Sequence, residues 1–226
     1  MSERIWDVVD DFVDETIVGE DDALVKARED SVGAGLPGIA VTPAQGKLLY
    51  LLARIHGAQR ILELGTLGGY STIWLARALP PGGLLVTVEL EEAYAEVAAR
   101  NIARAGVSDR VRQRLGPAAE HLGALSAEGV EPFDFVFMDA DKAGTPEYLE
   151  LVLTLVRPAS VIVSDNSVRD GKVGDPDTPD AGAQGMRRMH ELLASARERG
   201  TLSSTTIQTV GAKGYDGFTL ILVEDV

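Results

Sequence analysis

The chain has 226 residues, a formal net charge of −14 at pH 7 and no cysteine. The lack of cysteine excludes disulfides, thiolate metal ligands and a cysteine nucleophile, and the negative charge argues against nucleic acid or an anionic membrane as the main partner. Because no apolar stretch is long enough to cross a bilayer and no secretory leader is visible, we expect a cytoplasmic protein.

The N-terminal part predicts helices and a loop. Apolar side chains within Ile5–Val18 recur at helical spacing, and Gly19 ends that helix. A second, shorter helix is expected at residues 22–29, followed by a glycine-rich loop at residues 33–40.

A third helix is predicted from its capping residues. Thr42 and Gln45 can form a capping box, and Pro43 suits the first helical position. This helix is expected to continue to about His56 and to stop at Gly57.

Strands and helices alternate in the rest of the chain. The expected strands span residues 60–64, 84–89, 112–115, 133–138, 160–164, 205–210 and 218–223. Two of the expected helices span residues 71–79 and 92–105, and a third, short one begins at about residue 118. A fourth runs from residue 145 to before Pro158. The last follows a loop at residues 165–180 and ends at about residue 198.

This alternation predicts an α/β fold, with a parallel sheet and helices on both of its faces. The last two strands form a hairpin around a loop at residues 213–217 and add an antiparallel strand. We expect one domain over residues 1–226, with residues 1–40 as a helical appendage and residues 41–226 as the core.

Two expected strands end in side chains that carry oxygen. One ends at Asp139, with Lys142 just beyond it, and the following one ends at Asp165 and Asn166. Ligands bind at the carboxyl ends of strands in open α/β sheets, and carboxylate and amide oxygens suit a hard metal cation with a base beside it. The alternatives remain open that these residues only form turns and that Lys142 only pairs with Asp139 or Asp141.

Glycines fill the loop after the first strand, Glu63-Leu-Gly-Thr-Leu-Gly-Gly-Tyr-Ser71, and Glu89 ends the next strand. This is the position at which an acid meets ribose hydroxyls in dinucleotide folds. The spacing departs from G-x-G-x-x-G, which favours a nucleoside without a pyrophosphate, and the acidic Glu63 fits a cationic one. The alternative is a loop that merely needs small residues.

Taken together, these motifs resemble those of cation-dependent S-adenosylmethionine O-methyltransferases, the group that includes caffeoyl-CoA and catechol O-methyltransferases. The resemblance covers nearly the whole chain from Val41. The segments that carry it are Val41–Lys47, Ile61–Ser71, Met138–Lys142, Ser164–Asn166, Gly171–Val173 and Asp216–Leu220.

The resemblance implies a Rossmann-like class I methyltransferase fold with a seven-stranded, mostly parallel sheet. It also implies a homodimer, S-adenosylmethionine as methyl donor and a divalent cation, usually Mg²⁺, with Mn²⁺ and Ca²⁺ as alternatives. Lys142 matches the family's proposed base. The implied metal ligands are Asp139, Asp165 and Asn166. The implied cofactor contacts are Val41, Glu63, Gly65, Thr66, Ser71, Glu89, Ala118, Asp141 and Tyr148, with Glu89 on the ribose hydroxyls.

Two segments near the expected acceptor site, Ala143–Pro146 and Val168–Arg169, depart from the family pattern. The expected acceptor is a small catechol-like molecule, because a cation can hold one of two neighbouring hydroxyls while the other is methylated. Two other hypotheses stay open: O-methylation of a non-catechol hydroxyl in a secondary metabolite, and cofactor binding without catalysis. An NAD-dependent enzyme is less well supported, because the glycine pattern that holds phosphates is missing.

Overall fold

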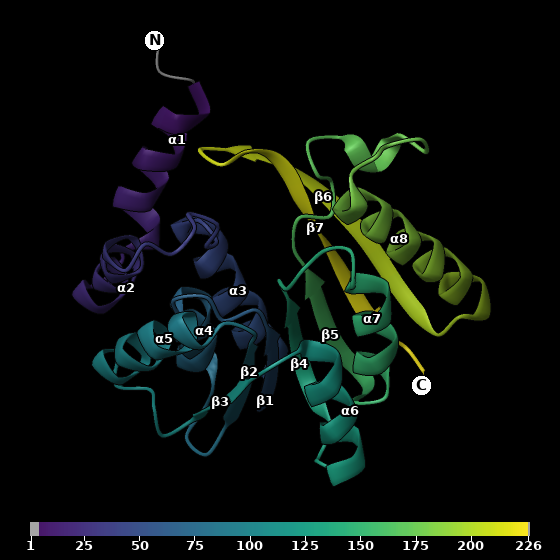
Figure 1. The fold of residues 1–226 in the computed structure, drawn as a ribbon, viewed down its shortest axis with the longest axis horizontal. Coiled ribbons are helices and arrows are strands. Elements are labelled where there is room, and N and C mark those ends of the chain that lie inside the picture. The colour runs from purple at the N-terminus through teal and green to yellow at the C-terminus, as the bar shows by residue number, and fades with distance from the viewer. Residues whose placement is uncertain (1–4, 226) are drawn as a thin grey trace. The chain divides into compact units, whose positions relative to one another are not determined.

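The computed structural model describes residues 5–225 (Figure 1). Its strands are β1 Arg60–Leu64, β2 Leu84–Glu89, β3 Val111–Leu115, β4 Phe133–Met138, β5 Val156–Ser164, β6 Leu202–Gly211 and β7 Gly214–Val223. Its α-helices are α1 Ile5–Val13, α2 Asp22–Gly33, α3 Pro43–His56, α4 Tyr70–Ala78, α5 Glu92–Arg104, α6 Ala118–Glu128, α7 Thr145–Leu153 and α8 Ala181–Arg199. A π-helical turn spans Asp14–Val18 and a 3₁₀ turn spans Lys172–Gly174.

The strands form one seven-stranded sheet in the order β3-β2-β1-β4-β5-β7-β6. The pairs β2–β3, β1–β4 and β4–β5 are parallel, and β5–β7 is antiparallel. The expected sheet, mostly parallel with an antiparallel C-terminal addition, is thereby confirmed.

The chain divides into two compact units. The first unit comprises Met1–Arg60, Thr66–Gly116 and Gly211–Lys213, and the second comprises Ile61–Gly65, Pro117–Val210 and Gly214–Val226.

In the first unit, local signals in the sequence set the ends of α3. Thr42 Oγ1 accepts from Gln45 N at 3.2 Å, and Gln45 Oε1 accepts from Thr42 N at 3.0 Å, so the predicted capping box is present. Gly57 ends the helix in the left-handed conformation with φ 77°. Both predictions for this helix are confirmed.

The N-terminal segment of the first unit differs from the expectation of one helix over residues 5–18. Its α-helical part ends at Val13, and the π-helical turn leads to Gly19, where φ is 63°. The apolar side chains of this segment lie largely in solvent: Ile5 is 76% exposed and Phe12 is 63% exposed. The second helix begins at Asp22, as expected, with Asp21 as its N-cap, but it continues to Gly33 instead of ending at residue 29.

The second unit is built on buried strands. The strands β4 and β5 run in register from Phe135 opposite Val161 to Met138 opposite Ser164. The side chains of Phe133, Phe135 and Phe137 are fully buried, as apolar runs in parallel strands predict. The helices α6, α7 and α8 lie in succession alongside these strands (Figure 1).

Three strand predictions for this part of the chain are too short, including that for β6, which spans Leu202–Gly211 instead of residues 205–210. The strand β5 begins at Val156 instead of residue 160, and its pairing with β4 is irregular around Pro158, since Phe133 is opposite Val156 and Phe135 is opposite Val161. The residues expected as a loop at 213–217 belong largely to β7, which begins at Gly214. Among the described residues, none of the helices is long and apolar enough to cross a membrane.

Candidate active site

The ends of β4 and β5 bring the predicted metal ligands together in the second unit. Met138 and Ser164 are in register, so Asp139 and Asp165 follow at the same end of the sheet. The backbone continues to pair beyond the strands, because Asp139 N donates to Leu64 O at 2.8 Å and Asp165 N donates to Met138 O at 3.1 Å. The backbones of Asp139 and Asp165 thereby lie at the ends of neighbouring strands.

Asp139, Asp165 and Asn166, called here the oxygen-bearing set, offer carboxylate and amide oxygens, which are ligands that suit a hard divalent cation. Asp165 is 5% exposed, and a buried carboxylate is stable as an anion only beside positive charge or hydrogen-bond donors. Within residues 5–225, no three His, Cys, Asp or Glu side chains form a cluster that could hold a metal. The predicted set instead has two carboxylates and one amide, because Asn166 follows Asp165 in the sequence.

Lys142 lies against the same strand end. Its Nζ donates to Asp139 Oδ1 at 2.6 Å, and the side chains are 10% and 20% exposed, respectively. The pairing with Asp139 that the sequence left open is therefore present. It does not by itself exclude a role as base, since the same contact holds the amine beside the predicted cation ligands.

Asp141 and Tyr148, both predicted to contact the cofactor, interact with each other. Asp141 Oδ1 accepts from Gly144 N at 2.8 Å and thereby holds the start of α7. Its other oxygen accepts from the Tyr148 hydroxyl. Burial, followed by this carboxylate, raises the pKa of Tyr148, so the phenol stays protonated and serves as a donor. Ala118, a further predicted contact, is half-buried at the first position of α6.

The glycine loop begins in the second unit, at the end of β1. Glu63 is completely buried on this strand. Gly65 has a φ of 95°, and a Cβ placed there would lie 2.5 Å from the carbonyl oxygen of Asp139. The position therefore needs glycine both for its backbone conformation and for its close approach to the end of β4.

Gly65→Ala is expected to lower the free energy of unfolding by about 2–4 kcal/mol, because strain at a positive φ adds to a collision with backbone. Urea unfolding measures this change. Gly57→Ala is the matched control, since Gly57 has a φ of 77° but nothing within 4 Å of its Cβ position. Equal losses in the two variants would show that the contact with Asp139 is unimportant.

In the first unit, Glu89 holds the rest of the glycine loop. Its Oε2 accepts from Thr66 N at 3.1 Å and from Leu67 N at 2.7 Å, and its Oε1 accepts from Glu91 N at 2.9 Å. Glu89 is predicted to bind ribose hydroxyls, and two carboxylate oxygens offer about four acceptor positions. The structure adds a second task for this side chain, which is to fix the loop.

The loop leads into α4 in the same unit. Gly69 is the N-cap of this helix and provides no side-chain acceptor, so the first turn, which contains Ser71, keeps amide groups for other partners. Thr66 is buried and its hydroxyl lies 2.6 Å from that of Thr87. Val41, predicted to line the cofactor pocket, is 5% exposed and immediately precedes the cap of α3.

Asn101 on α5 is a residue that reasoning from the sequence missed. It is fully buried, and its Nδ2 donates to Gly68 O at 2.9 Å and to Ala27 O at 3.4 Å. Asn101 thus ties the glycine loop to α2. An amide in the middle of a helix otherwise rich in alanine was the available signal.

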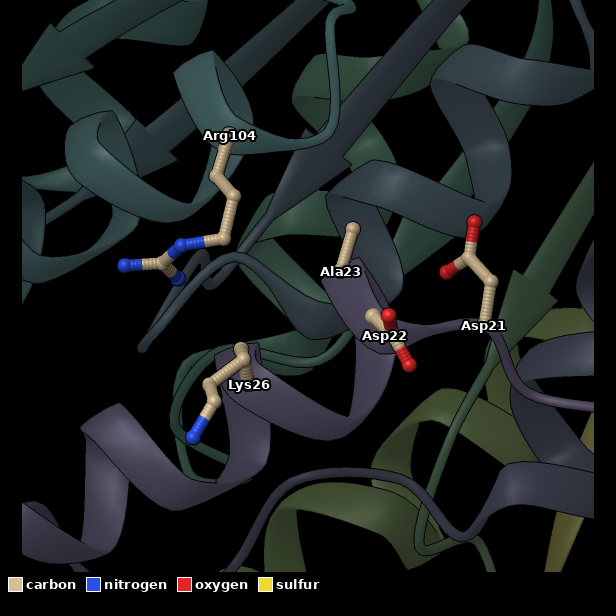
Figure 2. A pocket seen from close by; sticks show the side chains of 5 residues that line it. All are labelled: Asp21, Asp22, Ala23, Lys26 and Arg104. Carbon is tan, nitrogen blue, oxygen red and sulfur yellow. The ribbon is translucent and has the colours of Figure 1, made fainter.

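A surface hollow in the first unit is a different feature (Figure 2). Three of its charged side chains have partners: Lys26 pairs with Glu29, Arg104 with Asp30, and Asp21 with Arg77. The lining residues are Asp21, Asp22, Ala23, Lys26 and Arg104. None of the predicted site residues lines it, so we assign it no catalytic role.

Known proteins are similar to this chain in sequence and in structure. A family model described as O-methyltransferase matches residues 14–221. A catechol O-methyltransferase of Niastella koreensis is 45% identical over 224 residues, which cover 99% of this chain and 100% of that protein. The matched length is therefore nearly the complete chain.

Two solved structures are similar over almost their whole length. The O-methyltransferase TomG from Streptomyces achromogenes, involved in tomaymycin synthesis and in complex with SAM, has a TM-score of 0.94 and 53% identity, with 99% of each chain covered. An O-methyltransferase from Bacillus cereus in complex with SAH has a TM-score of 0.94 and 47% identity, with 97% of this chain and 98% of that chain covered. They confirm the Rossmann-like methyltransferase fold, and the chain belongs to the O-methyltransferase family.

Proposed function

We propose that the protein is a cation-dependent O-methyltransferase that moves a methyl group from S-adenosylmethionine to one hydroxyl of a catechol-like acceptor. The observation that carries the proposal is the oxygen-bearing set at the ends of β4 and β5, with Lys142 in contact with Asp139. The similarity to a catechol O-methyltransferase and to structures in complex with SAM and SAH supports it.

The proposed cofactor contacts follow the family pattern. Glu89 would accept hydrogen bonds from the ribose hydroxyls, and the glycine loop lets backbone approach the ligand closely. The negative charge of Glu63 suits a sulfonium ligand with its ammonium group. The full proposed set is Val41, Glu63, Gly65, Thr66, Ser71, Glu89, Ala118, Asp141 and Tyr148.

Asp139, Asp165 and Asn166 are the residues that would hold a divalent cation, with Mg²⁺ as the first candidate and Mn²⁺ or Ca²⁺ as alternatives. A bound cation would hold two neighbouring acceptor oxygens and stabilise the negative charge on one of them. This requirement favours vicinal hydroxyls over a single one.

Lys142 is the proposed base. The acceptor oxygen forms a bond to the methyl carbon while the bond from that carbon to sulfur breaks, and S-adenosylhomocysteine leaves. The hydroxyl proton passes to Lys142 Nζ. Asp139 positions this amine through the 2.6 Å contact. Alignment and exclusion of water supply the rest of the rate enhancement.

We also propose a homodimer. The exposed apolar side chains of the N-terminal segment support it, with Ile5 76% exposed and Ile17 70% exposed, since patches of this kind mark interfaces. Sedimentation equilibrium at micromolar concentration measures the assembly. A monomer under these conditions would contradict the proposal.

A non-catechol hydroxyl in a secondary metabolite is the second candidate acceptor. The 53% identity to a methyltransferase involved in tomaymycin synthesis favours it. The segments Ala143–Pro146 and Val168–Arg169, where this chain departs from the family pattern, are where a different acceptor would be recognised.

A panel of acceptors with methyl-labelled S-adenosylmethionine separates these functions. The panel pairs each vicinal dihydroxy aromatic with its analogue that carries a single hydroxyl. We expect labelled product only from the vicinal compounds. Product from single hydroxyls alone would favour the second candidate, and calorimetric cofactor binding without turnover on any acceptor would indicate a binding protein.

A further inference from the structure

We propose that Asp216 is a positioning residue that fixes which atom of the Asn166 side chain faces the cation. The inference rests on the proposed function, because it assigns a task to a neighbour of one proposed cation ligand. Asp216 lies on β7, 50 residues from Asn166 in the sequence. The two residues meet through the antiparallel pairing of β7 with β5, in which Ser164 is opposite Thr219.

The two oxygens of Asp216 have separate partners. Asp216 Oδ2 accepts from Asn166 Nδ2 at 3.1 Å. Asp216 Oδ1 accepts three backbone N–H groups, those of Val168 at 3.0 Å, Arg169 at 2.9 Å and Gly217 at 2.9 Å. One carboxylate thus holds both the amide of the proposed ligand and the backbone that follows it.

The chemistry of these groups decides the orientation of the amide. A carboxylate only accepts hydrogen bonds, whereas an amide has a donor on one side and an acceptor on the other. Turning the amide over would bring its oxygen against Asp216 Oδ2 and place two acceptors together. Asn166 therefore directs its NH₂ group to Asp216 and keeps its oxygen, the atom that a hard cation binds, for the other side.

The backbone around Asn166 also depends on Asp216. Asn166, Arg169 and Asp170 have φ values of 52°, 55° and 54°, a region that residues other than glycine rarely adopt. Such conformations persist only where surrounding contacts hold them. The hydrogen bonds from Val168 N and Arg169 N to Asp216 supply contacts of this kind.

Close packing leaves β7 little freedom relative to this turn. Ser167 N donates to Gly217 O at 2.8 Å. A Cβ at Gly217 would collide with the carbonyl oxygen of Ile207 and with a methyl group of Val168. Gly217 therefore lets the strand approach closely enough for the neighbouring Asp216 to reach the turn.

Exchange of the two side chains tests the assignment. In Asp216→Asn, the new amide keeps its oxygen on the backbone N–H groups and directs its NH₂ toward Asn166, which then turns its own NH₂ toward the cation position. Mn²⁺ affinity, measured by electron paramagnetic resonance on the full-length protein, is expected to fall about 10- to 100-fold. Adding Asn166→Asp restores a donor–acceptor pair and a free oxygen, so the double variant is expected to recover the affinity to within about threefold.

Two controls separate positioning from loss of charge or of folding. Asp170→Asn removes the same charge from an exposed residue of the same turn and is expected to leave Mn²⁺ affinity unchanged. Thermal unfolding and calorimetric binding of S-adenosylmethionine show whether each variant is folded. A purely structural role would change these two measurements along with Mn²⁺ affinity.

The outcomes distinguish this inference from the proposed function. If the wild-type protein binds Mn²⁺ and Asp216→Asn binds it equally well, the assignment is overturned and the cation site stands. If Asp216→Asn loses Mn²⁺ and the double variant does not recover it, the orientation argument is overturned. A wild-type protein with no Mn²⁺ affinity would overturn the cation site and this assignment together.

Discussion

Asp165→Ala is expected to lower kcat on the order of 10³-fold, because a lost cation ligand removes several kcal/mol of charge stabilisation from the transition state. Asp165 is 5% exposed at the end of β5, where its backbone is tied to Met138. Binding of S-adenosylmethionine is expected to stay within about threefold, since this carboxylate is not among the proposed cofactor contacts. Turnover, calorimetric cofactor affinity and Mn²⁺ affinity together measure the effect.

The matched control is Asp177→Ala, which removes the same group from an exposed position in the loop after β5. It is expected to change kcat less than about twofold, because isolated surface substitutions have small effects. A folded Asp165→Ala variant with wild-type turnover would contradict the assignment of this carboxylate as a cation ligand.

Lys142→Met is expected to lower kcat by about 10²- to 10⁴-fold, the usual contribution of a general base. The KM for the cofactor is expected to change little, because Lys142 is not among the proposed cofactor contacts. Initial rates with the acceptor at saturation and the cofactor concentration varied measure both effects.

Lys142→Arg separates the two roles that remain for this residue. Arginine keeps a positive charge beside Asp139 but does not give up its proton in proteins. If Lys142 acts as the base, the arginine variant is expected to be as slow as the methionine variant. High activity in Lys142→Arg would instead mean that the ion pair with Asp139, at 2.6 Å, is the whole contribution of this residue.

The buried strands could be predicted from the sequence because their signal is local. The bounds expected for β1, β2 and β4 match those of the structure, since each is an apolar run with polar or glycine-rich ends. The capping of α3 is equally local, because Thr42 and Gln45 are one helical turn apart. Asp139 and Asp165 could be expected at one sheet edge because parallel strands end on the same side.

The C-terminal hairpin could not be predicted as well, because its structure depends on distant partners. Most side chains of β6 are exposed, so the strand lacks a clear alternating pattern. The first residues of β7 include two glycines and an aspartate, residues typical of loops. Pairing with β5 and close packing around Gly217 override this local preference.

Hydrogen-bond partners far apart in the sequence were also beyond prediction. The contact of Asn166 with Asp216 joins residues 50 positions apart, and that of Asn101 with Gly68 joins residues 33 positions apart. The sequence shows that each group needs a partner, but only the folded chain shows which one it has. The exposed apolar side chains of α1 show the same limit. Their helical spacing predicts that the helix has an apolar face, but it does not identify the surface against which that face packs.

Dependence of turnover on a divalent cation is the central claim, and a chelator titration tests it directly. Methyl transfer from labelled S-adenosylmethionine to catechol is measured with protein that has been stripped of metal, first in excess chelator and then with Mg²⁺ added back. We predict background turnover in chelator and full recovery with Mg²⁺. Full activity in the presence of the chelator would contradict the account.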